Sequence, residues 1–135
     1  MKKYILASLF VVFCIMNNGC TKFEPAIVNM SVTPIVYPNT CLIDCKADVT
    51  NDGGCKYFNE MGFCFSLKPN PTYKGEDVIT VISMEDVETT NFTLNYPAPL
   101  LDTIYYVRAY VCTNAGTGYS EIATISTYQP VAPAK

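Results

Sequence analysis

Cysteine is the side chain in this sequence with the clearest capacity for chemistry. The 135 residues include seven cysteines but no histidine and no tryptophan. Without histidine there can be no histidine-based general acid–base catalysis, no Ser–His or Cys–His nucleophile pair and no histidine-containing metal site. A reactive thiol would need some other neighbour to lower its pKa. The inventory therefore favours a protein that is not an enzyme.

The spacing of the candidate ligands does not indicate a metal site. Cys41 and Cys45 lie in a segment of alternating polarity, where residues four apart on a strand are separated by about 13 Å. That separation is too long for a disulfide, and no further zinc ligands accompany either cysteine in the sequence. Asp44, Asp48 and Asp52 fall on the same segment and its turn, which favours a solvated face over a calcium loop. We expect no metal and no cofactor.

The N-terminal residues resemble an export signal. Lys2 and Lys3 precede an uncharged apolar run over residues 4–16, which is too short for a comfortable membrane span and typical of a secretory signal peptide. The small residue directly before Cys20 resembles a bacterial lipoprotein signal, in which Cys20 becomes the acylated N-terminus. Cleavage elsewhere and an uncleaved anchor are the alternatives. We expect residues 1–19 to be the signal peptide and residues 20–26 a lipid-anchored tether.

Strand signals fill the rest of the chain. Runs of alternating or β-branched residues are separated by Gly, Pro, Asn and Asp clusters, and no window has a sustained helical period. The expected strands are 27–32, 41–50, 57–66, 78–84, 92–96, 104–112 and 119–128. This pattern predicts an all-β fold, a single two-sheet β-sandwich of about seven strands over residues 27–128, followed by a flexible tail over 129–135.

The charge balance excludes one class of partner. Charged residues make up 16% of the chain, with 9 basic against 12 acidic. A nucleic-acid binder needs a basic footprint. We therefore expect no nucleic-acid partner.

Several blocks together resemble a known family. They are residues 52–54, 60–66, 69–72, 103–110 and 114–119. In combination they are similar to the fibronectin type III-like domains of cell-envelope lipoproteins in Bacteroidetes. The resemblance implies a fibronectin type III/immunoglobulin-like sandwich in a non-enzymatic lipoprotein of the outer membrane, on its periplasmic or cell-surface face. It would act in binding, adhesion or assembly with a protein or glycan partner. The alternative is a small exported thiol/redox or hydrolytic protein that uses cysteine or carboxylates.

The resemblance also implies roles for particular residues. Thr103 and Tyr105 would form a tyrosine corner, in which the Tyr105 hydroxyl bonds a backbone group upstream, although an ordinary core tyrosine is the alternative. The strands that Cys55 opens and Cys112 ends would be antiparallel neighbours, so a Cys55–Cys112 disulfide is the expected pairing. A Cys41–Cys64 bridge is a weaker alternative, with Cys64 more simply a free buried thiol.

Two surfaces are candidates for partner binding. Tyr106, Arg108 and Tyr110 form an outward stripe on the longest strand, where aromatic rings beside an arginine can stack on sugars or anchor a protein. The alternative is cross-strand packing on a solvated sheet face. A second surface would comprise Asn114, Thr117 and Tyr119 in a glycine-rich loop. We expect this loop and the Gly53–Gly54 loop to lie at the same end of the sandwich and to form a binding platform.

Overall fold

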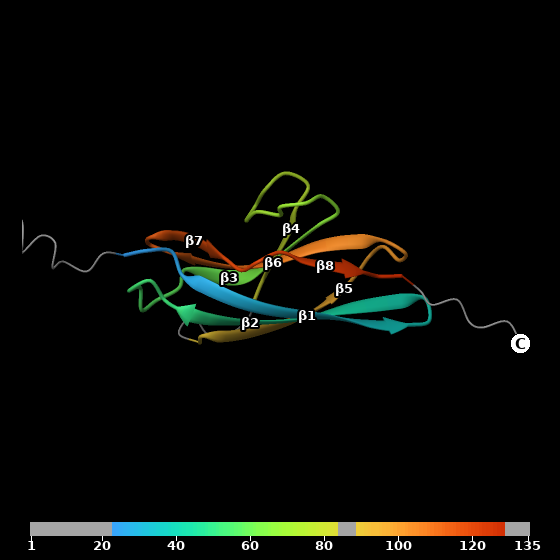
Figure 1. Cartoon of the computed structure of the whole chain (residues 1–135), viewed down its shortest axis with the longest axis horizontal. Coiled ribbons are helices and arrows are strands. Elements are labelled where there is room, and N and C mark those ends of the chain that lie inside the picture. The colour runs from blue at the N-terminus through green and yellow to red at the C-terminus, as the bar shows by residue number, and fades with distance from the viewer. Residues whose placement is uncertain (1–22, 84–88, 129–135) are drawn as a thin grey trace, which may run out of the picture.

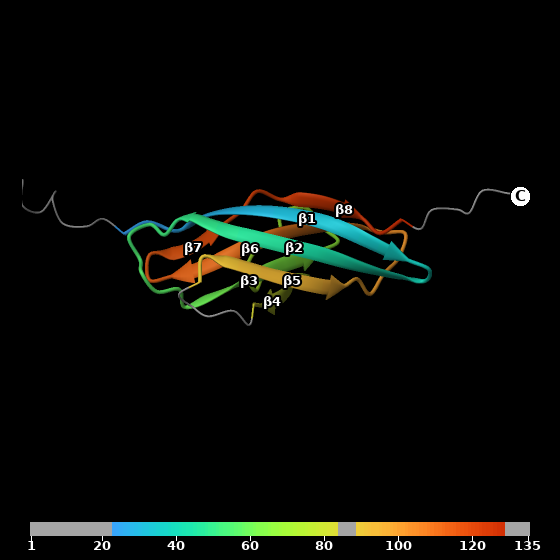
Figure 2. The same cartoon turned by 90° about the horizontal axis from the view of Figure 1, so that it is seen from below.

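The computed structural model describes residues 23–83 and 89–128, and this part of the chain folds into two antiparallel sheets packed face to face. Figure 1 shows the two layers edge-on, and Figure 2 looks onto the sheet that contains β1, β2 and β5. No helix occurs among the described residues. The predicted all-β two-sheet sandwich is therefore confirmed, and its strand order is compatible with an immunoglobulin-like fold.

The first sheet has the order β1-β2-β5, with strands Ile27–Tyr37, Thr40–Asn51 and Asn91–Pro97. The predicted end of β1 near Pro34 is wrong, since β1 continues and Pro34 pairs with Ile43. β1 is an edge strand, and an edge position tolerates a residue that cannot donate a ladder hydrogen bond. The first sheet therefore extends further toward the β1–β2 turn than the sequence predicted.

The second sheet has the order β4-β3-β6-β7, with β8 also pairing with β6. Its strands are Glu60–Ser66 (β3), Ile79–Ile82 (β4), Ile104–Thr113 (β6), Gly116–Tyr119 (β7) and Ala123–Ser126 (β8). Of the strand predicted over 119–128, only Tyr119 and residues 123–126 are in strands, and β7 lies mostly in the glycine-rich stretch predicted to be a loop. β7 and β8 pair with opposite halves of β6. β3 begins at Glu60 rather than at residue 57.

Alternation places one face of each sheet in a common core. β2 contributes every second residue from Cys41 to Val49, all buried, as the sequence predicted. Between the layers, the Phe63 and Phe92 rings lie 5.2 Å apart. The Phe65 and Tyr96 rings stack at 3.9 Å. These contacts hold the two sheets at a fixed separation.

The Gly53–Gly54 loop and strand β7 both contact the chain segment that leads into β1. Gly53, Gly54 and Gly116 all have positive φ, whereas Gly118 does not. The backbone N–H of Glu24 donates to the Gly53 carbonyl at 2.9 Å. A Cβ on Gly53 would lie 1.8 Å from the Glu24 carbonyl oxygen, and one on Gly118 would lie 2.0 Å from that of Ala26. These glycines therefore allow the entering chain to pack closely against the Gly53–Gly54 loop and against β7.

Candidate functional site

The proposed lipidation site, Cys20, lies outside the described residues. The structure instead shows where the chain enters the fold. Phe23 and the Gly53–Gly54 loop lie at one end of the sandwich, which we call the proximal end, together with the β6–β7 turn at Asn114. The β1–β2 turn and the start of β6 lie at the other end, which we call the distal end (Figure 1). The two glycine loops thus share one end, as expected from the sequence.

Tyr105 has the geometry that the sequence predicted for a tyrosine corner. Its ring is buried at the start of β6, and its hydroxyl accepts a hydrogen bond of 3.0 Å from the backbone N–H of Leu100. Thr103 caps the same turn, because its hydroxyl donates to the Leu101 carbonyl at 2.8 Å. The backbone N–H of Thr103 donates to the buried hydroxyl of Thr127 at 3.1 Å. This corner fixes the loop between β5 and β6.

The outward stripe on β6 does not form an open binding surface. Tyr110 is on the outer face, as alternation predicts, but its side chain is 0% exposed. The segment 67–78 between β3 and β4 stands over this face (Figure 1), and the Tyr73 ring lies 4.7 Å from the Tyr110 ring. The Tyr110 hydroxyl donates to Glu60 at 2.9 Å. Burial and this hydrogen bond both raise the pKa of Tyr110. The prediction of an exposed Tyr110 is therefore wrong.

Arg108 and Tyr119 support the same covering segment. The Arg108 guanidinium lies 4.4 Å from the Tyr119 ring centroid, and its Nε donates to the Ser120 carbonyl at 2.9 Å. The Tyr119 hydroxyl accepts a hydrogen bond from the backbone N–H of Tyr73 at 2.9 Å. Both side chains are half-buried, as is Tyr106 on the same face. Their contacts are those of cross-strand packing, the alternative that the sequence left open.

The second predicted surface is divided between two places. Thr117 lies on the outer face of the second sheet, where its hydroxyl is 3.6 Å from the Cys112 sulfur. Asn114 is exposed at the proximal tip and accepts a hydrogen bond from the Asn59 amide at 3.3 Å. Thr117 and Tyr119 thus lie on the outer face of β7, and Asn114 lies in the turn that precedes this strand.

The Cys55–Cys112 disulfide suggested by the sequence is not formed in the structure, where both residues are free thiols. The register explains why, since the residue opposite Cys112 on β3 is Glu60 and Cys55 lies in the loop before that strand. Cys55 is buried at the proximal end, while Cys112 points to the outer face of the second sheet. Cys41 and Cys64 are also free and fully buried, on different sheets.

The buried thiols are poorly suited to redox or nucleophilic chemistry. Burial, with the Asp44 carboxylate adding to it, raises the pKa of the Cys45 thiol to about 12. Burial raises the pKa of Cys64 to about 11, and it also raises the pKa values of Cys41 and Cys112. The thiolate is the reactive form of cysteine. These shifts argue against thiolate chemistry at the four positions.

We expect Cys45 and Cys64 to resist alkylation at pH 8 in the folded protein. A thiol with a pKa near 11 has about one thiolate in a thousand molecules at that pH, and both side chains are fully buried. Mass spectrometry after a short iodoacetamide pulse should find them unmodified, whereas the same pulse in urea should label both. Labelling of either residue at equal rates in the two conditions would contradict this expectation.

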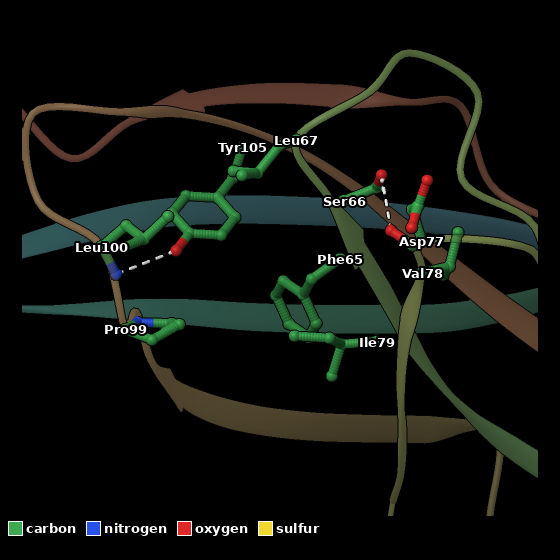
Figure 3. A pocket seen from close by; sticks show the side chains of 9 residues that line it. All are labelled: Phe65, Ser66, Leu67, Asp77, Val78, Ile79, Pro99, Leu100 and Tyr105. Atoms are coloured by element: carbon green, nitrogen blue, oxygen red, sulfur yellow. Dashed lines mark hydrogen bonds between the residues drawn. The ribbon is translucent and has the colours of Figure 1, made fainter.

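The sequence did not predict an apolar cleft at the distal end (Figure 3). This cleft has a volume of about 350 Å³, within the range of small-ligand pockets. Its lining residues are Phe65, Ser66, Leu67, Asp77, Val78, Ile79, Pro99, Leu100 and Tyr105. Leu67, Ile79 and Leu100 are about half exposed, so the rim is apolar as well as the floor. Exposed aliphatic residues beside turn signals were the only sequence indication of this surface.

The polar residues that line the distal cleft, Ser66 and Asp77, are engaged in hydrogen bonds and an ion pair. The Ser66 hydroxyl donates to the backbone carbonyl of Asp77 at 3.1 Å and accepts from the N–H of Lys68 at 3.0 Å. The Asp77 carboxylate forms an ion pair with Lys68. These groups hold the two ends of segment 67–78 together. The cleft wall is therefore fixed by contacts within the fold.

A second hollow, also of about 350 Å³, lies at the proximal end. It is lined by Phe23, Gly54, Cys55, Lys56, Tyr57 and Asn114. Phe23 and Tyr57 are 58% and 66% exposed, respectively. This hollow therefore combines two exposed aromatic rings with one lysine.

The described part of the chain offers no cluster of three or more Cys, Asp or Glu side chains that could hold a metal ion. Within residues 23–83 and 89–128, no helix is long and apolar enough to cross a membrane. A scan against protein-family models and a search of curated proteins found no match to this chain.

Proposed function

We propose that this protein is a non-enzymatic lipoprotein of the outer membrane, anchored through acylated Cys20, whose single β-sandwich acts in binding, adhesion or assembly. The domain would lie on the periplasmic or the cell-surface face. The N-terminal signal and the family resemblance in the sequence support the anchor. The partner would be a protein or a glycan.

The observation that carries the binding role is the position of the distal cleft. The chain enters the fold at the proximal end, whereas the cleft opens beside Tyr105 at the start of β6. β6 runs from there to Thr113 near the proximal loops, a distance of about 26 Å at 3.3 Å per residue. A domain tethered at its proximal end would therefore present this cleft away from the bilayer.

The chemistry of the distal cleft favours an apolar contact group. Its polar side chains, Ser66 and Asp77, are already engaged with groups of the fold, and the Tyr105 hydroxyl accepts from Leu100. The exposed aliphatic rim gains free energy when it is covered, at about 25 cal/mol per Å² of apolar surface. An apolar side chain of a partner protein or the apolar face of a sugar ring fits this description.

We expect Leu67→Asp to weaken partner binding at least about tenfold, because a carboxylate on an apolar rim must be desolvated when the partner docks. Leu67 is 50% exposed, so the folded domain tolerates the change. The full-length protein would be tested on a glycan array and by capture from solubilised envelope fractions. Ile35→Asp is the matched control, because Ile35 is also exposed, at 37%, but lies on β1 away from the cleft. Equal binding by the two variants would exclude the cleft, and absence of any binding by the unmodified protein would leave only a spacer role.

A further inference from the structure

The proximal hollow is placed where a lipid anchor would bring it to a membrane surface. Phe23 is three residues from Cys20 in the sequence, and three residues of fully extended chain span at most about 11 Å. The polar headgroup layer on each side of a bilayer is about 5–8 Å thick. An acylated Cys20 would therefore keep Phe23 within or just above the headgroups.

The entering chain cannot swing freely away from this end of the sandwich. The N–H of Glu24 is bonded to Gly53, and Ala26 is packed so closely on β7 that only glycine fits at residue 118. Ala26 and Val28 are themselves buried in the core. From Glu24 onward the entering chain is thus held against this end of the sandwich, so an anchor at Cys20 would keep the proximal end close to the membrane.

The side chains at this end match the chemistry of a membrane interface. Phe23 and Tyr57 are among the most exposed large side chains of the described residues, and aromatic rings are enriched at the headgroup level of bilayers. Lys56 is exposed and lines the same hollow, where it can pair with a lipid phosphate. Glu24 and Asp52 are exposed nearby. Their negative charges offset the positive charges of Lys56 and Lys22, and a balanced charge matches a zwitterionic surface better than a strongly anionic one.

We propose that the proximal end, made by Phe23, Lys56 and Tyr57, rests in the headgroup layer of a zwitterionic bilayer. This inference depends on the lipid anchor of the proposed function. It assigns a role to the two exposed aromatic rings that packing does not explain. It also replaces the binding platform that the sequence suggested at the glycine loops with a membrane contact.

The absence of tryptophan from the chain gives a clean test. Full-length acylated protein carrying Tyr57→Trp would be reconstituted in phosphatidylcholine vesicles with and without lipid that carries a nitroxide quencher on its headgroup. We expect blue-shifted emission and loss of about half of the fluorescence or more, because a ring at the headgroup level lies beside the quencher. Tyr37→Trp is the matched control, since Tyr37 is also exposed but lies at the distal β1–β2 turn, and it should retain its emission.

The outcomes separate the membrane contact from the anchor. Flotation of the protein with vesicles, together with quenching of the Tyr57→Trp variant alone, would support the contact. Flotation with no quenching of either variant, or with equal quenching of both, would overturn the contact and leave the anchor intact. Failure to float would reject the anchor and the contact together.

Two further variants test the chemistry of the contact. Adding Phe23→Ser to the Tyr57→Trp variant should reduce quenching, because half of the aromatic surface is removed. Replacing part of the phosphatidylcholine by phosphatidylglycerol should not increase it, because the negative charges of Glu24 and Asp52 offset the positive charges of Lys22 and Lys56. Stronger quenching on anionic vesicles would overturn the preference for zwitterionic lipid.

Discussion

Cells that express a Cys20→Ser variant should lose at least about tenfold of the fatty-acid label that the unmodified protein incorporates. The thiol of Cys20 is the group that would carry the lipid, and a serine hydroxyl is a much weaker nucleophile at neutral pH. Each buried methylene of an acyl chain contributes roughly 0.8 kcal/mol to membrane affinity, so several chains are needed to hold the domain firmly. Metabolic labelling with an alkyne fatty acid, followed by purification and gel detection, would measure the loss.

Cys14→Ser is the matched control for this experiment. Cys14 lies within the apolar run of the signal rather than at its end. Its replacement also removes one thiol, but it should leave the label unchanged. Retention of the label in the Cys20→Ser variant, or its equal loss in both variants, would show that Cys20 is not the lipid-bearing residue.

Gly118→Ala should lower the free energy of unfolding by about 2–3 kcal/mol, because it overpacks a rigid contact. The added Cβ would lie 2.0 Å from the carbonyl oxygen of Ala26 and 2.8 Å from its carbonyl carbon, both backbone atoms. Neither side of the contact can move aside by a rotamer change. The start of β1 must therefore shift away from β7, and it should lose its protection in hydrogen exchange first.

Urea unfolding followed by circular dichroism would measure this cost. Thr117→Ala is the control, since residue 117 lies on the same strand and its side chain faces outward toward Cys112. It should cost less than about 1 kcal/mol. Equal stability of the Gly118→Ala variant and the unmodified protein would mean that Ala26 is not packed tightly against Gly118 on β7.

Period-two alternation was enough to predict the fold class and most of the inward-facing residues. The alternating segment that starts at Cys41 became β2 with the expected face buried. Local pattern succeeds here because one face of each sheet meets the core. The same reasoning could not find the true end of β1, because the edge position that tolerates Pro34 depends on the order of strands in the sheet.

The candidate site was harder to predict because it depends on long-range packing. Alternation correctly placed Tyr110 on the outer face, but it carries no information about the segment 67–78 that covers this face. The Cys55–Cys112 pairing failed for a related reason, since β3 begins only at Glu60, which lies opposite Cys112 and leaves Cys55 in the loop before the strand. The distal cleft depends on loops from three parts of the chain, and no motif in the sequence marks it.

The most direct test of the whole account is the mass of the N-terminal peptide of the protein purified from cell envelopes. Trypsin cuts after Lys22, so a lipid-anchored protein should yield residues 20–22 carrying a diacylglyceryl group on Cys20. That result would establish the anchor on which both the outward presentation of the distal cleft and the membrane contact of the proximal end depend. An unmodified N-terminus at any residue, or a chain that still begins at Met1, would contradict the account.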